Sequence, residues 1–502
     1  MSLAIVFSRA GLGVEAPLVI VEVDLSNGLP CFSIVGLPET TVKESKDRVR
    51  GAITNSQFEF PVKRITVNLA PADLPKDGGR FDLPIAIGLL ASSGQLPDLH
   101  LDQYEFIGEL ALSGECRSVQ GVLPVAIQTR NAKKILVVSE QNAYEASLVS
   151  DLEVLPAKNL LAVCAHLTGQ QKINPYIPEP QQTIQHYTVC LSDVHAQHHA
   201  KRALEIAAAG GHSLLMVGPP GTGKTMLASR LPSIMPDMTE QEALETAAVR
   251  SISSSRQFKT ETWQQRPFRS PHHTASGVAL VGGGSSPRPG EISLAHNGVM
   301  FLDELPEFNR NVLEVLREPL ESGNITISRA ARTSDFPARF QLIAAMNPCP
   351  CGYLGHSDNR CVCTSEQIER YRSKISGPLM DRIDMHIEVP SVATKLLREQ
   401  PQESEPTSNE IRKKVNRARE IQLKRSPKPN NQLAVKQIEK WCVLETEDLS
   451  LLEDAIEKLG LSARAYHRIL KVARTIADLD DMENIKTKHL TEAIAYRKFD
   501  RK

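Results

Sequence analysis

The segment from Gly218 to Thr225 has the residue types and spacing of a phosphate-binding loop. It fits the pattern G-x-x-x-x-G-K-[ST] at every position, with Gly218, Pro219, Pro220, Gly221, Thr222, Gly223, Lys224 and Thr225 in order. Glycines let backbone N–H groups close around phosphate oxygens, and the N-terminus of a following helix adds partial positive charge. Lys224 would reach the β- and γ-phosphates, and Thr225 would hold Mg²⁺. The apolar run 213–217 before the loop predicts a strand, and 226–231 after it predicts the helix, so a chance glycine-rich turn is disfavoured.

Two adjacent carboxylates follow a second apolar run, residues 298–302. Asp303 would complete the Mg²⁺ coordination, as a Walker B aspartate does. Glu304 is placed to polarise a water molecule for attack on the γ-phosphate. The alternative is an ordinary core strand that ends in an acidic turn. Together with the glycine loop, the pair predicts hydrolysis of ATP, with ATP and Mg²⁺ as cofactors, rather than nucleotide binding alone.

Three more polar residues stand where AAA+ ATPases have functional residues. Asn347 follows the apolar run 341–346 and resembles sensor 1, which can hold the attacking water. Arg382 resembles an arginine finger that would reach into a neighbour's nucleotide and stabilise charge in the transition state. Arg464 matches the sensor 2 position at the start of a C-terminal helix, with Arg468 one turn later. Any single one could be a surface residue or a cap, so the prediction depends on their order and spacing.

Four of the nine cysteines lie close together as two C-x-C pairs. They are Cys349, Cys351, Cys361 and Cys363. In a reducing compartment, such a cluster indicates metal ligands rather than disulfides. Four thiolates can converge on one tetrahedral Zn²⁺ and leave no open coordination position. The sequence therefore predicts a structural zinc site, with four free thiols as the alternative.

Longer motifs make a family resemblance specific. They are the segment 193–212, Arg-Ser-Pro-His-His at 269–273, Arg-Pro-Gly-Glu-Ile at 288–292 and Met-Asn-Pro-Cys-Pro-Cys-Gly at 346–352. Over essentially its whole length, the chain closely resembles the ComM/YifB family of bacterial magnesium-chelatase-like proteins. The resemblance implies a homo-hexameric ring ATPase of the helix-2-insert type. It also implies a DNA motor that drives branch migration in natural transformation or homologous recombination. One departure is Ala196, where the family pattern leads us to expect glycine.

The same resemblance draws attention to two insertions that would line the pore of a ring. The first, from about 251 to 296, contains Arg266 and Arg269. The second is a hairpin predicted before sensor 1, with Arg329 and Arg332 near its turn. Arginines there suit contact with phosphates, so we predict single-stranded or branched DNA as a partner. For any one arginine, a solvated charged face is the alternative.

The elements that must position these residues fall into four segments, which predict an α/β multidomain fold. Residues 1–170 alternate strand and helix patterns and resemble the Lon protease catalytic domain (ribosomal S5 domain 2-like). Arg80 stands there in place of the nucleophilic serine, and the dyad lysine is missing, so we expect no proteolysis. Residues 171–190 predict a linker. Residues 191–392 predict an AAA+ P-loop core, and residues 393–502 predict a helical lid.

Composition sets wider limits. Hydrophobic residues make up 41% and charged residues 23% of the 502 residues, as in ordinary soluble proteins. The formal net charge of −1 gives no bulk basic surface, so any DNA-binding surface must be local. No apolar run approaches the ~20 residues that span a bilayer, and the N-terminus lacks the pattern of a signal peptide. We therefore expect a cytoplasmic protein with no membrane partner.

Two other functions remain open at this point. A chelatase-type ATPase that remodels a protein partner would carry the same nucleotide motifs. An ATP-dependent protease is opposed by Arg80, because acyl transfer needs both a nucleophile and its base.

Overall fold

The computed structural model describes residues 3–96, 100–178, 187, 189–253, 262–284, 287–329, 332–355, 360–391 and 406–497. The chain divides into two compact units. One comprises Met1–Ile184, Leu244–Trp263 and Ala330–Phe336, and the other comprises Gln185–Ala243, Gln264–Arg329 and Pro337–Lys502. Each unit has its own buried apolar core. The second unit contains the segment predicted as a helical lid and most of the segment predicted as the ATPase core, except 244–263 and 330–336.

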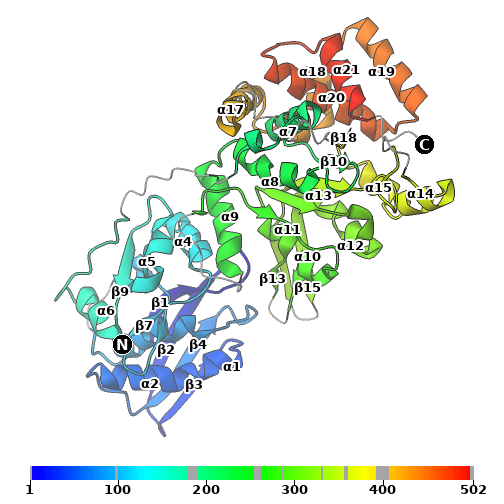
Figure 1. Ribbon diagram of the computed structural model, residues 1–502. Helices are drawn as coiled ribbons and strands as arrows, with labels where there is room; N and C mark the ends of the chain where they lie inside the picture. The colour runs from blue at the N-terminus through cyan, green and yellow to red at the C-terminus, as the bar shows by residue number, and fades with distance from the viewer. Residues whose placement is uncertain are drawn as a thin grey trace. The chain divides into compact units, whose positions relative to one another are not determined.

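Up to residue 184, the first unit is built on a four-stranded sheet, a three-stranded sheet, the two-stranded sheet β6-β7 and the helices around them (Figure 1). Its elements are β1 Leu3–Arg9, β2 Leu18–Ser26, β3 Cys31–Val35, α1 Thr40–Lys43, α2 Ser45–Asn55, β4 Arg64–Ala70, η1 Gly79–Phe81, α3 Asp82–Ser92, η2 Leu101–Gln103, β5 Tyr104–Phe106, β6 Glu109–Leu110, β7 Cys116–Arg117, α4 Val122–Asn131, β8 Ile135–Ser139, α5 Glu140–Ser147, β9 Val154–Ala157 and α6 Leu160–Leu167.

Helix α3 fills the core of this unit. The larger sheet has the order β1-β2-β4-β3, and only β3 and β4 are parallel neighbours. Strand β2 alternates fully and partly buried residues, as a strand does when one face covers a core. Nearly all residues of α3 are buried, and a Cβ on its Gly88 would lie 2.6 Å from Val23 of β2. Helix and sheet therefore pack in close contact. A second, parallel sheet has the order β5-β8-β9.

After residue 190, the chain forms a parallel sheet with helices and ends in a run of helices. The elements are η3 Leu191–Asp193, α7 His198–Gly210, β10 Leu214–Val217, α8 Lys224–Ile234, α9 Glu240–Ile252, β11 Phe268–Arg269, α10 Gly277–Val281, β12 Gly282–Gly283, β13 Arg288–Pro289, α11 Glu291–Leu294, β14 Val299–Leu302, η5 Leu305–Glu307, α12 Arg310–Val315, α13 Arg317–Ser322, β15 Asn324–Arg329, β16 Arg332–Pro337, β17 Gln341–Met346, α14 Ser365–Arg372, α15 Gly377–Met380, β18 Met385–Glu388, α17 Ser408–Arg425, η6 Asn430–Gln432, α18 Val435–Trp441, α19 Thr446–Leu459, α20 Ala463–Leu479 and α21 Thr487–Ala495.

The five-stranded sheet positions the nucleotide motifs. Its order is β11-β14-β17-β10-β18, and each neighbouring pair is parallel. Every residue of β10, β14 and β17 is buried, as expected for strands covered on both faces. The carboxyl ends of parallel strands meet at one edge of the sheet, and in such sheets ligands bind at that edge. The glycine loop, the paired carboxylates and Asn347 follow β10, β14 and β17, so all three come to this edge.

The C-terminal helices share one apolar core with the sheet. From residue 408 on, all described elements are helices, and α18 to α21 lie together in Figure 1. Helix α20 buries Ile469, Val472, Ala473 and Ile476, a spacing that forms one face of a helix. These residues join the cluster that contains Leu214 of β10. Among the described residues, no helix combines the length and the apolar character that a membrane crossing requires.

Candidate nucleotide site and cysteine cluster

The glycine loop has the backbone geometry that its sequence requires. A Cβ on Gly218 would lie 2.2 Å from the carbonyl oxygen of Val389, so only glycine fits there. Gly221 and Gly223 have φ values of +76° and +81°, a region that L-residues with side chains rarely adopt. Gly223 is the N-cap of α8, and therefore the loop leads directly into the positive end of that helix.

Lys224 lies against the loop that precedes it. Its Nζ donates hydrogen bonds to the carbonyl oxygens of Gly218 and Pro219, both at 2.8 Å, and lies 3.4 Å from Oδ1 of Asn347. Burial lowers the pKa of Lys224, while the charges of Asp303 and Glu304 act in the opposite direction. The ammonium group thus lies buried against the carbonyl groups of the loop, where its positive charge would attract a phosphate group.

Oxygen ligands suited to Mg²⁺ meet beside this lysine. Oγ1 of Thr225 donates to Oδ2 of Asp303 at 2.7 Å, although 78 positions separate the two residues. A hydroxyl and a carboxylate are the hard oxygen donors that Mg²⁺ prefers, usually together with phosphate oxygens and water. These two residues therefore fit the ion. When bound, it would neutralise charge that develops on the phosphates.

Glu304 follows Asp303 on an unusual backbone. Its φ of +52° lies in the left-handed region, and its N–H donates to Oδ1 of Asp303 at 2.9 Å. Residues at functional sites often hold such strained conformations. The sharp turn separates the directions of two adjacent carboxylates, so that one can face the metal position and the other a water molecule.

Arg382 is turned into its own chain, which differs from the predicted reach toward a neighbour. The residue is 7% exposed, and its guanidinium donates to the carbonyl oxygen of Pro378 at 2.7 Å and forms an ion pair with Glu321. A finger acting in trans would have to exchange Glu321 for a phosphate. Arg464 is exposed at the start of α20.

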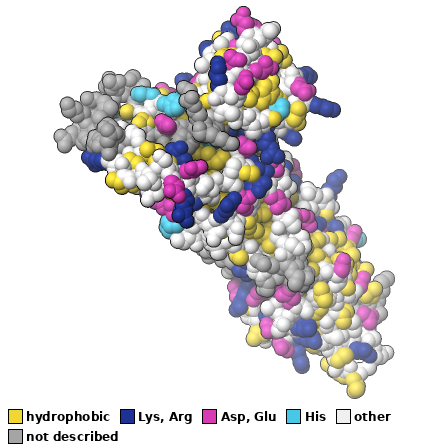
Figure 2. All heavy atoms as spheres, turned by 90° about the vertical axis from the view of Figure 1, so that its right-hand side faces the viewer, with side chains coloured by type: hydrophobic (Ala, Val, Ile, Leu, Met, Phe, Trp, Pro, Cys, Tyr) yellow, Lys and Arg dark blue, Asp and Glu magenta, His cyan; other side chains and the backbone are white. Residues whose placement is uncertain are grey.

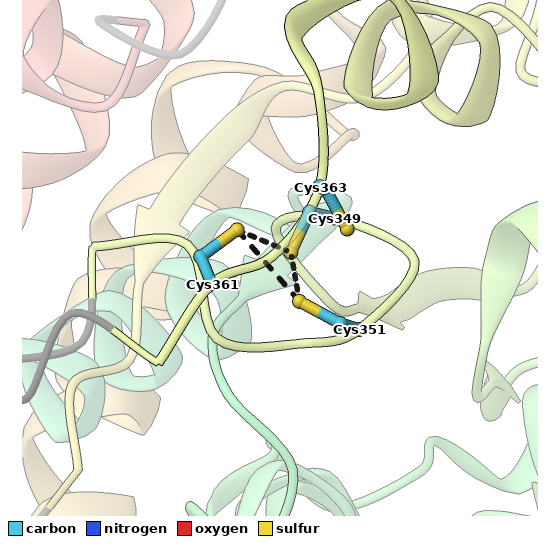
Figure 3. Close-up of side chains that lie close together, drawn as sticks. All are labelled: Cys349, Cys351, Cys361 and Cys363. Atoms are coloured by element: carbon cyan, nitrogen blue, oxygen red, sulfur yellow. Dashed lines mark hydrogen bonds between the residues drawn. The ribbon is translucent and has the colours of Figure 1, made fainter.

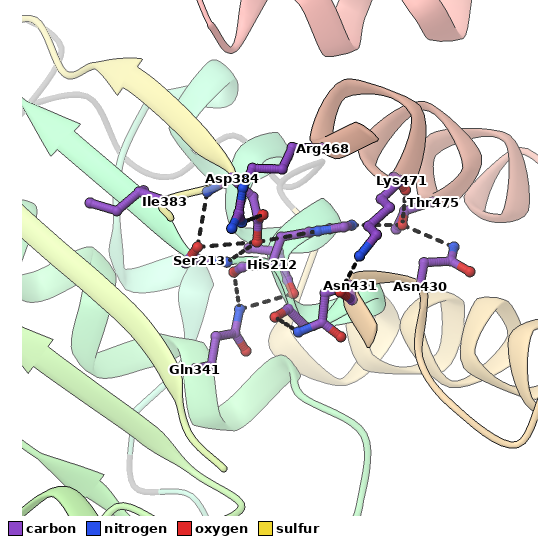
Figure 4. Close-up of polar contacts among 12 residues, drawn as sticks. His212, Ser213, Gln341, Ile383, Asp384, Asn430, Asn431, Arg468, Lys471 and Thr475 are labelled. Carbon is purple, nitrogen blue, oxygen red and sulfur yellow. Dashed lines mark hydrogen bonds and ion pairs between the residues drawn. The ribbon is translucent and has the colours of Figure 1, made fainter. Parts of the chain in front are cut away.

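Arg468, one turn beyond Arg464, belongs to a buried polar network instead (Figure 4). It forms an ion pair with Asp384 and donates to the carbonyl oxygen of Arg382. Burial alone would raise the pKa of Asp384, but Arg468, His212 and the Ser213 N–H hold it well below its usual range. Nε2 of His212 lies 2.8 Å from Oγ1 of Thr475 in α20. The network therefore connects α20 to the strands β10 and β18.

The four predicted zinc ligands converge in space (Figure 3). Sγ of Cys349 lies 3.4 Å from Sγ of Cys351 and 3.7 Å from that of Cys361, and all four sulfur atoms lie within 4.8 Å of one another. Tetrahedral zinc with Zn–S bonds of ~2.3 Å separates its sulfur ligands by about 3.8 Å. Hydrogen bonds from the backbone N–H groups of Tyr353 and Val362 lower the pKa of the Cys351 thiol to about 6. Donor set and spacing fit a Cys₄ zinc site.

The cysteine cluster adjoins the nucleotide loop. A Cβ on Gly352, between the two cysteine pairs, would lie 2.8 Å from Cδ of Pro220 and 3.8 Å from Cγ of Asn347. Gly352 has a φ of +84°. The loop that carries the cysteines thus contacts both the phosphate-binding loop and the residue predicted as sensor 1.

The arginines predicted to contact DNA fall into two groups. Strands β15 and β16 form a two-stranded sheet, which agrees with the predicted hairpin. Arg329 and Arg332 end and begin these strands, but their side chains and residues 330–331 lie outside the described part of the structure. Arg269 is 40% exposed, yet its guanidinium makes two 2.6 Å hydrogen bonds to Glu291.

Arg266, which was predicted to contact DNA, has its guanidinium bound within its own chain. Its side chain is 8% exposed, because it donates to the carbonyl oxygens of Pro236 and Asn297, both at 2.6 Å, and pairs with Glu242. These acceptors occupy the guanidinium from several sides. Arg266 therefore ties together the segments around α9 and β14 instead of facing phosphates.

Sequence reasoning missed one contact. The ring centroids of His272 and His273 are 4.1 Å apart, and Nδ1 of His273 lies 3.1 Å from Oε2 of Glu304. The sequence feature that could have predicted this contact is the position of His273 shortly after β11, the strand that pairs with β14. Ala196 has a φ of +56°, which explains the expected glycine and costs about 1 kcal/mol.

In the first unit, the predicted likeness to Lon protease pairs Arg80 with a serine nucleophile. Arg80 lies in η1, and its guanidinium donates to the carbonyl oxygen of Gln120 at 2.9 Å. Burial lowers the pKa of Arg80 to about 10. The likeness of this unit to Lon protease stays a prediction.

Comparison with known proteins covers the whole chain. The family described as magnesium chelatase, subunit ChlI, matches residues 190–397, its C-terminal family matches 405–497, and the family described as subunit ChlI of Mg-chelatase matches 21–142. Competence protein ComM of Haemophilus influenzae is 56% identical over 99% of this chain and 98% of its own length. The YifB proteins of Escherichia coli and Salmonella typhimurium are each 52% identical over 100% of this chain and 98% of theirs. The chain therefore belongs to the ComM/YifB family of magnesium-chelatase-like AAA+ ATPases.

Proposed function

We propose that this protein is an ATP-driven DNA motor, a hexameric ring that moves DNA strands in natural transformation or homologous recombination. Its family implies an ATPase that uses ATP and Mg²⁺. The observation that carries the finer proposal is the 56% identity, over nearly all of both chains, to a protein named for competence.

The described residues support a specific hydrolysis step. Lys224 would bind the β- and γ-phosphates, and Thr225 and Asp303 would hold Mg²⁺. A water molecule would attack the γ-phosphorus and give its proton to Glu304 while Asn347 orients it. The bond from the γ-phosphorus to the bridging oxygen would break, and ADP would leave with that electron pair. Arg382 of a neighbouring subunit would stabilise the charge that develops.

DNA contact is proposed for the β15–β16 hairpin and for Arg269. Figure 2 shows Lys and Arg interspersed with Asp and Glu on the face it draws, in keeping with a formal net charge of −1. A local site such as the hairpin turn, with Arg329 and Arg332 at its two ends, is therefore a better candidate for DNA contact than a broad basic surface.

The test is to measure ATP hydrolysis with and without DNA, and branch migration of a labelled three-stranded junction. We expect DNA to accelerate hydrolysis and ATP to drive strand movement. Replacing Arg329 and Arg332 together by Ala should preserve basal hydrolysis, weaken DNA binding and reduce its salt dependence. If no DNA substrate changed the rate of ATP hydrolysis and no strand movement occurred, the result would argue against a DNA motor.

A second candidate is a chelatase-type ATPase that remodels a protein partner. The three family matches, all described by a magnesium-chelatase subunit, favour it. A protein partner, and not DNA, would then accelerate hydrolysis.

A further inference from the structure

His273 contacts the carboxylate that the proposed function needs as a base. Its Nδ1 lies 3.1 Å from Oε2 of Glu304. The two residues come from neighbouring parallel strands: β11 ends at Arg269, β14 ends at Leu302, and Arg269 is the register partner of Met300. The segments that leave these strands start at the same edge of the sheet, which brings His273 beside Glu304.

The ring of His273 is held on both sides. It meets Phe308 edge to face, with centroids 6.4 Å apart and planes at 81°, and packs against His272 at 4.1 Å. His272 is itself fixed, because its Nδ1 lies 2.9 Å from Oγ1 of Thr274. A ring packed in this way presents its nitrogen in one direction.

Glu304 is a side chain that needs such a partner. It is 52% exposed, whereas His273 is 31% exposed. A free glutamate loses about 1.5–2 kcal/mol of rotamer entropy when it is fixed in one orientation. The charge of Glu304 also opposes the lowering of the Lys224 pKa, so its carboxylate acts on the phosphate-binding lysine. The histidine therefore contacts a carboxylate whose charge reaches Lys224.

We propose that His273 is a positioning residue for Glu304: it donates a hydrogen bond to one carboxylate oxygen and leaves the other for the attacking water. The inference depends on the proposed ATPase activity and adds a residue to its site. His273 lies in the insertion predicted to line the pore, so the base is connected directly to a segment that would contact the substrate.

The experiment compares steady-state ATP hydrolysis without DNA in four proteins: the wild type, His273→Phe, His273→Asn and, as the control, His100→Phe at an exposed histidine of the first unit. Phenylalanine keeps a ring against Phe308 but removes the donor, and the Asn amide can donate close to the position of Nδ1. We expect kcat to fall about 10- to 100-fold in His273→Phe, with KM and ATP affinity within about twofold of the wild type, because a misplaced base affects only the chemical step. His273→Asn should recover most of kcat, and His100→Phe should retain it.

The outcomes separate the inference from the function on which it depends. A wild-type protein that hydrolyses no ATP would refute the ATPase and the positioning role together. If the wild type is active and His273→Phe is equally fast, only the positioning role fails. If Asn and Phe are equally slow at unchanged melting temperature, the hydrogen bond is not the cause and the proposal is overturned.

Discussion

At the scale of single residues, ATP binding and ATP hydrolysis are proposed to depend on different side chains. Lys224 donates to two loop carbonyl groups and lies near Asn347, whereas Glu304 contacts His273. Charge attraction to phosphate depends on the ammonium group, and proton transfer depends on the carboxylate. Substitutions at these two positions should therefore have different effects.

We predict that Lys224→Ala abolishes ATP binding. Glu304→Gln should bind ATP normally and hydrolyse it at least about 100-fold more slowly, because an amide cannot accept the proton of water. Equilibrium binding of a fluorescent ATP analogue and a phosphate-release assay measure the two effects. Glu307→Gln is the matched control: Glu307 is paired with Lys374 on the surface, so that variant should behave as the wild type. Wild-type hydrolysis by Glu304→Gln would show that another group activates the water.

At the scale of elements, two structures brace the site from outside it. The cysteine loop contacts Pro220 and Asn347, and the network around Asp384 ties helix α20 to the sheet. Both act through packing rather than through contact with the nucleotide. Their loss should appear first as lost stability.

We predict about one Zn²⁺ per chain. Cys363→Ser should lower the zinc content and the melting temperature, because metal binding contributes directly to folding free energy. ATP affinity should fall too, since the cysteine loop supports the phosphate-binding loop. Metal analysis and thermal unfolding measure these changes, with Cys31→Ser, an exposed cysteine outside the cluster, as the control. A folded wild type without metal would contradict the prediction.

The second element-scale prediction concerns pH. The pKa of Asp384 is lowered in the folded protein, so its carboxylate stabilises the fold fully above the unfolded pKa of about 3.9. This contribution is lost as the pH falls below that value toward the lower folded pKa. Asp384→Asn should destabilise the protein by about 3 kcal/mol, since it leaves Arg468 partly buried without its partner, and should flatten the acid limb of the stability profile. Urea unfolding between pH 3 and pH 7 provides the measurement, and an unchanged acid limb would contradict it.

At the scale of the whole molecule, the inward position of Arg382 bears on assembly. Its guanidinium pairs with Glu321 of the same chain, and the side chain of Glu321 is exposed. A role in a neighbour's site requires this pair to open when subunits meet. If Arg382 acts in a neighbour's site as proposed, the opening of this ion pair would couple assembly to hydrolysis.

We predict that Arg382→Ala binds ATP normally and has little turnover. Mixing it with Lys224→Ala subunits should restore part of the activity. The intact nucleotide loop of an Arg382→Ala subunit can then lie beside the intact Arg382 of a Lys224→Ala subunit. Glu321→Gln should retain turnover, since it releases Arg382 without removing it. Hydrolysis rates of the separate and mixed proteins decide the point. Full activity of Arg382→Ala alone would exclude a role in trans.

The sequence by itself determined the nucleotide motifs, their strands and the cysteine set. In a glycine loop followed by a helix, or in four cysteines arranged as two C-x-C pairs, the residues that bind the ligand are close together in the sequence. Such motifs can therefore be recognised without the tertiary structure. Helix α20 begins at Ala463, so Arg464 lies at the start of a C-terminal helix, as the sequence predicted.

Only the tertiary structure decided which side chains are free to act. Arg266, Arg269 and Arg382 have the same charge in the sequence, but their partners Glu242, Glu291 and Glu321 are 24, 22 and 61 positions away. The contact of His273 with Glu304 likewise depends on two strands that are neighbours in the sheet and distant in the chain. Local patterns contain no information about such pairings, because they arise only when the sheet brings the strand ends together.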